Sequence, residues 1–180
     1  MLSRAAHAIL NLQNSLREVK AVNIWTERLE ANDLPLLAQW LTREDAALTP
    51  NSLPKEAGQL PVWLERQTQD QDQQVYLCLV YDTPVGAAGL HLQGETAELT
   101  LLLGERNYNP LRTATYLTLQ LLDRAFAEPG IQCAKIEVYD RHTWYFTPLE
   151  QMGFSPAGTG ESTTVLTVQK EVYLDRKYLF

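Results

Sequence analysis

The chain has 180 residues, of which 45% are hydrophobic and 21% charged, as in a single globular domain with a sizeable core. Its net charge is −7 and it contains no long basic run, so a nucleic-acid duplex is not an expected partner. The sequence has no stretch of about 18 apolar residues, and we therefore expect no membrane-spanning helix.

The cysteines and histidines do not form a metal-binding pattern. Cys78 and Cys133 both lie in apolar, strand-like runs, so we expect core thiols in a cytoplasmic protein, with a disulfide as the alternative. His7, His91 and His142 stand at no ligand spacing to either cysteine, and no metal site is predicted.

Residues 1–20 form a segment distinct from the rest of the chain. Their apolar residues recur near helical spacing, and three basic residues accompany a single acidic one, Glu18. This pattern predicts an amphipathic helical extension that packs on the domain or on a partner protein. A transit peptide has a similar composition and is the alternative. Residues 21–180 are predicted to form one domain.

The first third of the domain is predicted to contain one strand and two helices. Residues 22–29 are typical of a strand, and residues 34–42 of a helix that follows a capping signal at Asn32-Asp33. Residues 43–57 contain two prolines and are expected to be a loop. A second helix spans 60–69 with Pro61 in its first turn, and the glutamine-rich residues 67–74 are interpreted as a solvated linker.

The middle of the chain is predicted to be a hairpin followed by a strand, a loop and a helix. Strands at 75–81 and 85–92 flank a turn at 82–84. Residues 95–103 form the next strand, 104–111 a polar loop, and 112–127 a helix that Pro129-Gly130 ends. A strand, a loop and a helix in this order can direct backbone N–H groups at a phosphate.

The last third alternates between strand and helix. Residues 133–139 are rich in β-branched side chains and predict a strand, residues 141–152 are partly helical, and 163–173 form a strand that 177–180 extend. The expected fold class is α/β (mixed α+β). Its sheet is mostly antiparallel, with one β-α-β crossover.

This order of elements, with its motifs, resembles the GNAT N-acetyltransferase superfamily. Within that superfamily, the chain is most similar to the branch that acetylates N-terminal amines of ribosomal proteins and related small substrates. The resemblance covers residues 22–173 and is carried by residues 26–41, the hairpin VYLCLVYDTPVGAAGLHL, the pair AELTLLLG and TATYLTLQLLDRAF, and LEQMGF at 149–154.

The resemblance implies where acetyl-CoA would bind. In such a fold the strands at 95–103 and 133–139 splay apart, the pantetheine pairs with the first of them, and the pyrophosphate lies on the loop before the helix. An amine then attacks the thioester directly, so positioning supplies most of the rate. The predicted cofactor-binding residues are Leu101, Leu102, Leu103, Asn109, Arg112, Thr113, Ala114 and Thr115.

The phosphate loop departs from the family pattern, Q/R-x-x-G-x-G/A. Those positions hold Asn109, Arg112 and Ala114, and only Ala114 fits. Glycine allows the backbone to approach the pyrophosphate closely, and Pro110 removes one N–H donor. Arg112 either pairs with phosphate through its guanidinium or fills the site.

Two residues are candidates for catalysis. Glu98 is the predicted base, since it lies where the family branch has a glutamate on the central strand; a solvated carboxylate is the alternative. The family's thiolate-protonating tyrosine falls at Leu149, and Tyr145, one turn earlier, is the predicted substitute. The alternative for Tyr145 is ordinary burial. His91 and His142 are expected to be surface or capping residues.

The sequence offers two possible starts for the helical segment near Tyr145. Residues 147–150 read as an N-cap, a proline at the first position and a capping-box glutamate. A helix that begins there leaves 141–146 as an aromatic loop.

Two classes of function follow. The first is an acetyl-CoA-dependent N-acyltransferase that acts on a primary amine. The second is a protein of the same fold that has lost catalysis and acts as a binding or assembly factor. The missing loop glycine, the displaced tyrosine and the basic N-terminal segment favour the second, whereas the prevalence of enzymes in this fold favours the first.

Overall fold

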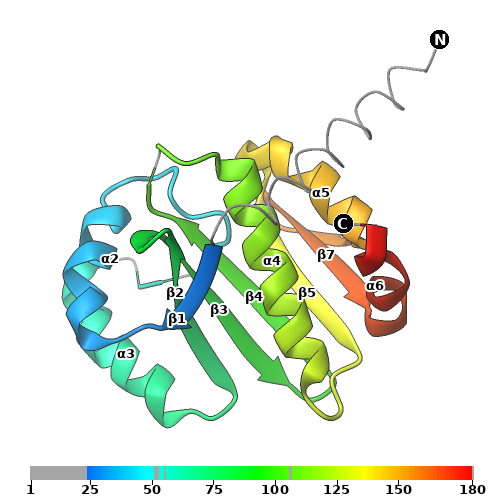
Figure 1. The fold of residues 1–180 in the computed structure, drawn as a ribbon, viewed down its shortest axis with the longest axis horizontal. Helices are drawn as coiled ribbons and strands as arrows, with labels where there is room; N and C mark the ends of the chain where they lie inside the picture. The colour runs from blue at the N-terminus through cyan, green and yellow to red at the C-terminus, as the bar shows by residue number, and fades with distance from the viewer. Residues whose placement is uncertain (1–23, 51–52, 55, 106, 180) are drawn as a thin grey trace.

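The computed structural model describes residues 24–50, 53–54, 56–105 and 107–179 (Figure 1). The predicted amphipathic helix at residues 1–20 lies outside the described residues, so its existence and its contacts stay predictions.

A seven-stranded sheet organises the described chain, with the spatial order β1-β2-β3-β4-β5-β7-β6. Every neighbouring pair is antiparallel except β4 and β5, which are parallel and joined through a long helix. The predicted fold class, a mixed and mostly antiparallel sheet with one crossover, is therefore confirmed. The strands are β1 Ile24–Arg28, β2 Gln73–Val80, β3 Thr83–Gln93, β4 Thr96–Leu103, β5 Cys133–Tyr139, β6 Ser155–Thr159 and β7 Thr163–Gln169.

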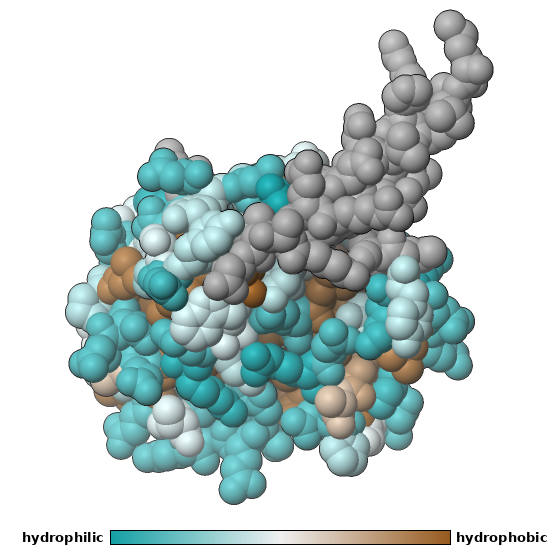
Figure 2. Space-filling view, in the orientation of Figure 1, coloured by the Kyte–Doolittle hydropathy of each residue, from teal (hydrophilic) through white to brown (hydrophobic). Residues whose placement is uncertain are grey.

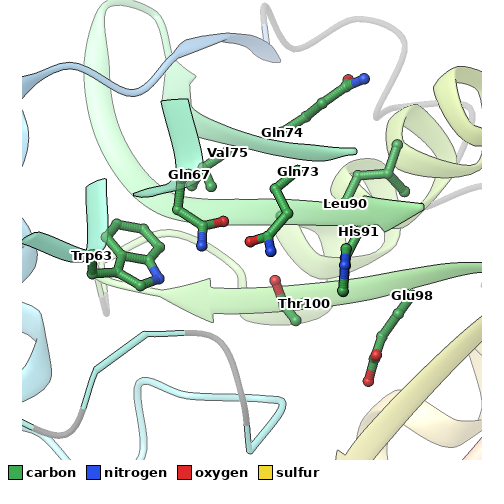
Figure 3. Close-up of a pocket in the computed structure, with 10 residues that line it drawn as sticks. Trp63, Gln67, Gln73, Gln74, Val75, Leu90, His91, Glu98 and Thr100 are labelled. Atoms are coloured by element: carbon green, nitrogen blue, oxygen red, sulfur yellow. The ribbon is translucent and has the colours of Figure 1, made fainter. Parts of the chain in front are cut away.

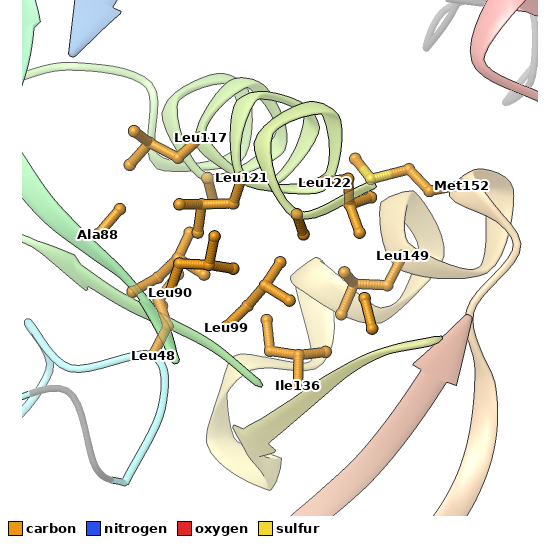
Figure 4. Close-up of a cluster of buried hydrophobic side chains, with 14 of the residues drawn as sticks. Leu48, Ala88, Leu90, Leu99, Leu117, Leu121, Leu122, Ile136, Leu149 and Met152 are labelled. Carbon is orange, nitrogen blue, oxygen red and sulfur yellow. The ribbon is translucent and has the colours of Figure 1, made fainter. Parts of the chain in front are cut away.

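Helices cover both faces of the sheet and create two hydrophobic cores. On one face are α4 (Pro110–Ala127), α5 (Phe146–Met152) and α6 (Lys170–Arg176), which pack on alternate residues of β3, β4, β5 and β7 (Figure 4). On the other face, α2 (Leu34–Leu41) and α3 (Leu60–Gln69) cover β2 and β3. Short 3-10 turns are η1 Ala31–Asp33, η2 Ala57–Gln59, η3 Asp140–Tyr145 and η4 Lys177–Leu179.

The face of the molecule seen in Figure 1 is mainly polar. Figure 2 shows mainly hydrophilic side chains over the face seen in Figure 1, with apolar residues in small separate groups. Among the described residues, most large apolar side chains are buried in the two cores, as expected when burial of apolar area drives folding.

Helix α4 forms for reasons visible in its sequence. The Asn109 side chain caps it by accepting a hydrogen bond from the Arg112 N–H at 3.1 Å, and Pro110 occupies the first helical position. Leu117, Leu121 and neighbouring apolar residues at helical spacing face the core. The helix begins two residues before the predicted start, because Pro110 initiates it rather than belonging to the loop.

Two predictions about elements are wrong, and the alternative start of the helix near 147 is not the one observed, whereas the partly helical character of 141–152 is confirmed. The predicted strand at 163–173 ends at Gln169, and α6 follows, with Tyr173 packed on Phe126 at a ring separation of 5.5 Å. The predicted linker at 67–74 is shortened from both sides, because α3 continues to Gln69 and β2 begins at Gln73. Helix α5 begins at Phe146, so Thr147 is not its cap. Edge strand β6 escaped prediction, since proline and glycine interrupt its pattern.

The two cysteines are free thiols, as expected, but their environments differ. Cys78 is fully buried in β2, and burial raises the pKa of its thiol to about 12. Cys133 is half-buried on β5, and its pKa is raised mainly by burial, an effect that hydrogen bonds from Gln169 and Val168 oppose.

We therefore predict that a disulfide reagent at about pH 8 modifies Cys133 first and reaches Cys78 only on unfolding, because thiolate character and exposure control the reaction. Thiol titration of the native and denatured protein measures this, and Cys133→Ser should abolish the native reaction. Equal rates for the two thiols in the native protein would contradict the prediction.

Candidate functional site

The central strands separate where the resemblance predicts. Strands β4 and β5 pair only from Thr96–Cys133 to Leu99–Ile136. Beyond that point, β4 continues beside β3 as far as Leu103, whereas β5 continues beside β7. A gap therefore opens between the carboxyl-terminal ends of the two strands.

The protein's own residues 46–49 fill this gap, and we call them the strap. The Leu48 N–H donates to the carbonyl of Leu101 at 3.0 Å, and the Leu103 N–H donates to the carbonyl of Ala46 at 2.7 Å. On the other side, the Tyr139 N–H of β5 donates to the Leu48 carbonyl at 3.0 Å. The strap thus runs between the splayed strands as a short, irregular substitute for a strand, antiparallel to β4.

The side chains of Ala46, Leu48 and Thr49 in the strap are buried. The Thr49 hydroxyl accepts a hydrogen bond from the Leu101 N–H at 3.1 Å, in a buried position. Leu48 packs beneath α4 with Leu99 and Ile136 (Figure 4), and Ala46 enters the core on the opposite face. Sequence reasoning assigned this segment to a loop. The available signal was its small apolar run, Ala-Ala-Leu, between charged residues and Pro50.

Two residues of η3 hold the strap from the outside, and we call them the latch. Arg141 donates through Nη2 to the carbonyl of Glu44, just before the strap, at 2.8 Å and to the strap carbonyl of Ala47 at 3.5 Å. Its guanidinium carbon lies 3.9 Å from the Tyr139 ring centre. His142 is buried, and its Nε2 donates to the Ala47 carbonyl at 2.9 Å. Burial lowers the pKa of His142; the bond to Ala47 opposes that change and Arg141 adds to it. His142, expected to lie at the surface or cap a helix, instead binds the strap.

Trp40 anchors the chain just before the strap. It is fully buried and lies over Gly104, where an added Cβ would stand 1.9 Å from Trp40 Cε2. Its Nε1 donates to the Glu105 carboxylate at 3.2 Å, and Arg43 donates to the Gly104 carbonyl. These contacts join the end of α2 to the end of β4 and so set where the strap enters the gap.

The predicted cofactor residues are close together, but much of their hydrogen-bonding capacity is in use. On the gap side of β4, the N–H groups of Leu101 and Leu103 are bonded to the strap. Leu102 forms the bridge to Ala47. Pantetheine cannot pair with this edge while the strap is in place, so the residues present do not fit acetyl-CoA in this arrangement.

The groups of the predicted phosphate loop are also partly used within the protein itself. Asn109 caps the Arg112 N–H, and Thr113, Ala114 and Thr115 are buried in α4. The Nη2 atom of Arg112 is buried and has no hydrogen-bond partner among the described residues. A buried guanidinium nitrogen without an acceptor is costly and would suit an anion.

Tyr145 lies in the core beneath α4. Its side chain is fully buried, and its hydroxyl shares a hydrogen bond with Thr118 Oγ1, which in turn donates to the Ala114 carbonyl. Burial raises the pKa of Tyr145 well above its usual range, and the bond to Thr118 opposes this only in part. The hydroxyl therefore ties η3 to α4; its predicted role towards a departing thiolate stays a prediction.

Glu98 lies on the sheet face opposite α4. It is half-buried and forms an ion pair with Lys135 of β5 at 3.4 Å. It also lines a small pocket of about 100 Å³, together with His91, Thr100 and Trp63 (Figure 3). Glu98 stands one residue before the last β4–β5 pair, at the vertex of the gap. This position suits its role as a base, which stays a prediction.

A larger pocket of about 320 Å³ opens at the wide end of the gap. Arg43, Arg141 and Trp144 line it, and Leu48 of the strap and Leu103 of β4 form part of its wall. The strap therefore separates this pocket from the space between the splayed strands.

Within the described residues, no group of three or more His, Cys, Asp or Glu side chains is arranged to hold a metal ion. Over the same residues, no helix has the length and apolar character needed to cross a membrane.

Comparisons with known proteins identify the fold. No family model matches the sequence, and no curated protein is detectably similar in sequence. Among solved structures, an uncharacterized protein from Bacillus halodurans is similar at a TM-score of 0.73 and 15% identity, over 88% of this chain and 90% of that one. Mutant forms of the spermidine/spermine N-acetyltransferase SpeG from Vibrio cholerae align at 0.70 and 15% identity, over 86% and 98%.

A GNAT-family acetyltransferase from Streptococcus pneumoniae aligns at a TM-score of 0.63 and 15% identity, over 82% of this chain and 99% of that one. At such identities the likeness establishes the fold alone. The predicted GNAT fold is confirmed, and the ribosomal-protein branch stays a prediction.

The Trp40–Gly104 contact yields a stability prediction. Gly104→Ala should lower the free energy of unfolding by about 1–3 kcal/mol, because the new methyl group collides with a buried indole. Urea denaturation measures the change. Gly58→Ala is the matched control, since nothing lies within 4 Å of its added Cβ. Equal stability of the two variants would show that Trp40 is not fixed where it is described.

Proposed function

We propose that the protein is an N-acyltransferase that moves an acetyl group from acetyl-CoA to a primary amine. The observation that carries the proposal is the separation of β4 from β5 after Leu99–Ile136, within a fold shared with N-acetyltransferases. A gap of this kind leaves backbone groups that something other than a neighbouring strand must pair. Residues 46–49 pair them in this structure, and in this proposal the pantetheine of acetyl-CoA takes their place.

The acceptor amine, in this proposal, approaches from the face that carries Glu98. The carboxylate would accept a proton from the incoming ammonium, directly or through water. With acetyl-CoA bound, the neutral amine would form the new C–N bond at the thioester carbonyl while the C–S bond breaks, and the CoA thiolate that leaves would take a proton from solvent. Lys135 orients the carboxylate through their ion pair. The side chains of the adjoining pocket include Gln67, Gln73 and Thr100, which offer acceptors to an amine.

The acceptor class is proposed from chemistry and likeness together. Aligned structures include enzymes whose names specify spermidine and spermine, so polyamines belong in the first set of substrates to test. The N-terminal amines of ribosomal proteins belong there too, on the sequence resemblance. The free thiols suit a reducing compartment such as the cytoplasm, which is the proposed location.

A second candidate function is favoured by the strap. If residues 46–49 never leave the gap, the protein cannot bind acetyl-CoA through β4 and is a non-catalytic binding or assembly factor. The burial of Tyr145 in the core agrees with this candidate. The N-terminal segment would then be the natural place to seek a protein partner.

One experiment separates the two candidates. Calorimetric titration with CoA, followed by a transfer assay with acetyl-CoA and a panel of spermidine, spermine and peptides with free N-terminal amines, tests the proposal. Saturable binding and transfer to one member support it. Absence of CoA binding, with the protein shown to be folded by its thermal transition, supports the second candidate.

If transfer is observed, Glu98→Gln should lower kcat by about 10²–10⁴-fold and flatten the rise of rate with pH, because the relay for the ammonium proton is lost. Glu95→Gln is the control, since that carboxylate is exposed just outside the same strand. Unchanged kinetics in the Glu98 variant would remove this residue from the mechanism.

A further inference from the structure

We infer that the strap, residues 46–49, is a displaceable internal occupant of the pantetheine site, so that acyl-CoA binds only when the strap withdraws. This inference rests on the proposed function. It assigns to the strap and to its latch, Arg141 and His142, control over cofactor access.

The hydrogen bonds of the strap are those that a cofactor arm would make. Splayed strands leave peptide groups of β4 and β5 buried without sheet partners, and buried N–H groups need acceptors. The strap supplies acceptors to Leu101, Leu103 and Tyr139 through two carbonyls and one hydroxyl. Pantetheine is itself a chain of amides, so it can supply acceptors to the same edge. Strap and pantetheine therefore compete for one set of partners.

The strap is not part of a regular strand ladder. The Tyr139 N–H of β5 donates to its Leu48 carbonyl, and its bridge to β4 is isolated rather than part of a ladder. The latch adds contacts to the Ala47 carbonyl, from His142 Nε2 at 2.9 Å and from Arg141 Nη2 at 3.5 Å, and Arg141 is exposed to solvent. Segments with few ladder bonds open at lower free energy than the core strands beside them.

Withdrawal would also join the gap to an existing pocket. Leu48 and Leu103 form part of the wall of the 320 Å³ pocket that Arg43 and Arg141 line. With Leu48 removed, this pocket would continue between the splayed strands, and its arginines would face the phosphate-bearing end of an entering ligand.

Competition of this kind has a quantitative consequence. When only a fraction of molecules is open, the apparent dissociation constant equals the intrinsic one divided by that fraction. A variant that weakens the closed state tenfold, about 1.4 kcal/mol, should therefore bind CoA roughly tenfold more tightly. This gain in affinity for CoA is the opposite of the loss of affinity that removal of a ligand contact would cause.

Thr49 provides the sharpest test. Thr49→Val keeps the shape of the side chain but removes the acceptor for the Leu101 N–H, whereas Thr49→Ser keeps the hydroxyl. Calorimetric titration with CoA should give roughly tenfold tighter binding for Thr49→Val than for Thr49→Ser and wild type. Equal affinities in all three would overturn the inference and leave the proposed function standing.

Opening of the strap is measured separately, without ligand, by amide hydrogen exchange at Leu48 and at Leu122 in α4. Thr49→Val and Arg141→Ala should each speed exchange at Leu48 several-fold and leave Leu122 unchanged. Arg176→Ala is the control for Arg141→Ala, since Arg176 also donates to a backbone carbonyl, that of Glu150 at 2.8 Å. If Leu48 exchanges only together with Leu122 in every variant, the strap does not open by itself and the inference fails.

A third outcome would contradict the proposed function but not the opening of the strap. Faster exchange at Leu48 in Thr49→Val, with no CoA binding by any variant, would mean that the strap opens but that the gap does not accept this cofactor. The protein would then belong to the non-catalytic candidate.

Discussion

Buried peptide groups at a splayed sheet edge are the constraint on which this structure depends. A sheet whose central strands separate must supply partners for the N–H and carbonyl groups that it exposes to the interior, since each buried group left unpaired costs about 1–3 kcal/mol. Here the partners come from residues 46–49 of the same chain. Residues 46–49 are held in this position from two sides. Trp40 packs over Gly104 on one side, and the latch residues Arg141 and His142 bind from the other.

The same constraint links the two functional candidates. If the protein is the proposed acetyltransferase, acetyl-CoA would complete the sheet edge, and without it the edge would be either hydrated or covered by the chain itself. A segment that covers the edge reversibly gives a gated enzyme, and one that covers it permanently gives a protein that keeps the fold without the chemistry. The difference is a free energy of strap opening, not a difference in fold.

Much of the fold could be predicted from the sequence, because its long elements have strong periodicity. The leucines of α4, and Ile136 and Val138 at alternate positions of β5, identified both elements. The tail was misassigned because alternation up to Gln169 masked the change of period in α6, where Tyr173 packs on Phe126. Strand β6 carries Pro156 and Gly158, which read as a loop although an edge strand tolerates both.

The candidate site was less accessible to sequence reasoning, for a physical reason. The family resemblance indicated Glu98 and the altered phosphate loop with Pro110 and Arg112, because these residues lie on or beside regular elements that could be aligned with the family pattern. The strap has no periodicity, and its short, small-residue sequence acquires meaning only when β4 and β5 are seen to part around it. Likewise, the pattern that placed Tyr145 near Leu149 could not reveal that its hydroxyl bonds to Thr118 within the core.

The most direct test of this account is a structure of the protein bound to CoA. The account predicts pantetheine between β4 and β5, with its amides bonded to the N–H groups of Leu101 and Leu103 and with residues 46–49 displaced from the gap. A complex in which CoA is bound while the Leu48 and Leu101 backbones remain hydrogen-bonded would contradict it, because strap and cofactor would then occupy different places.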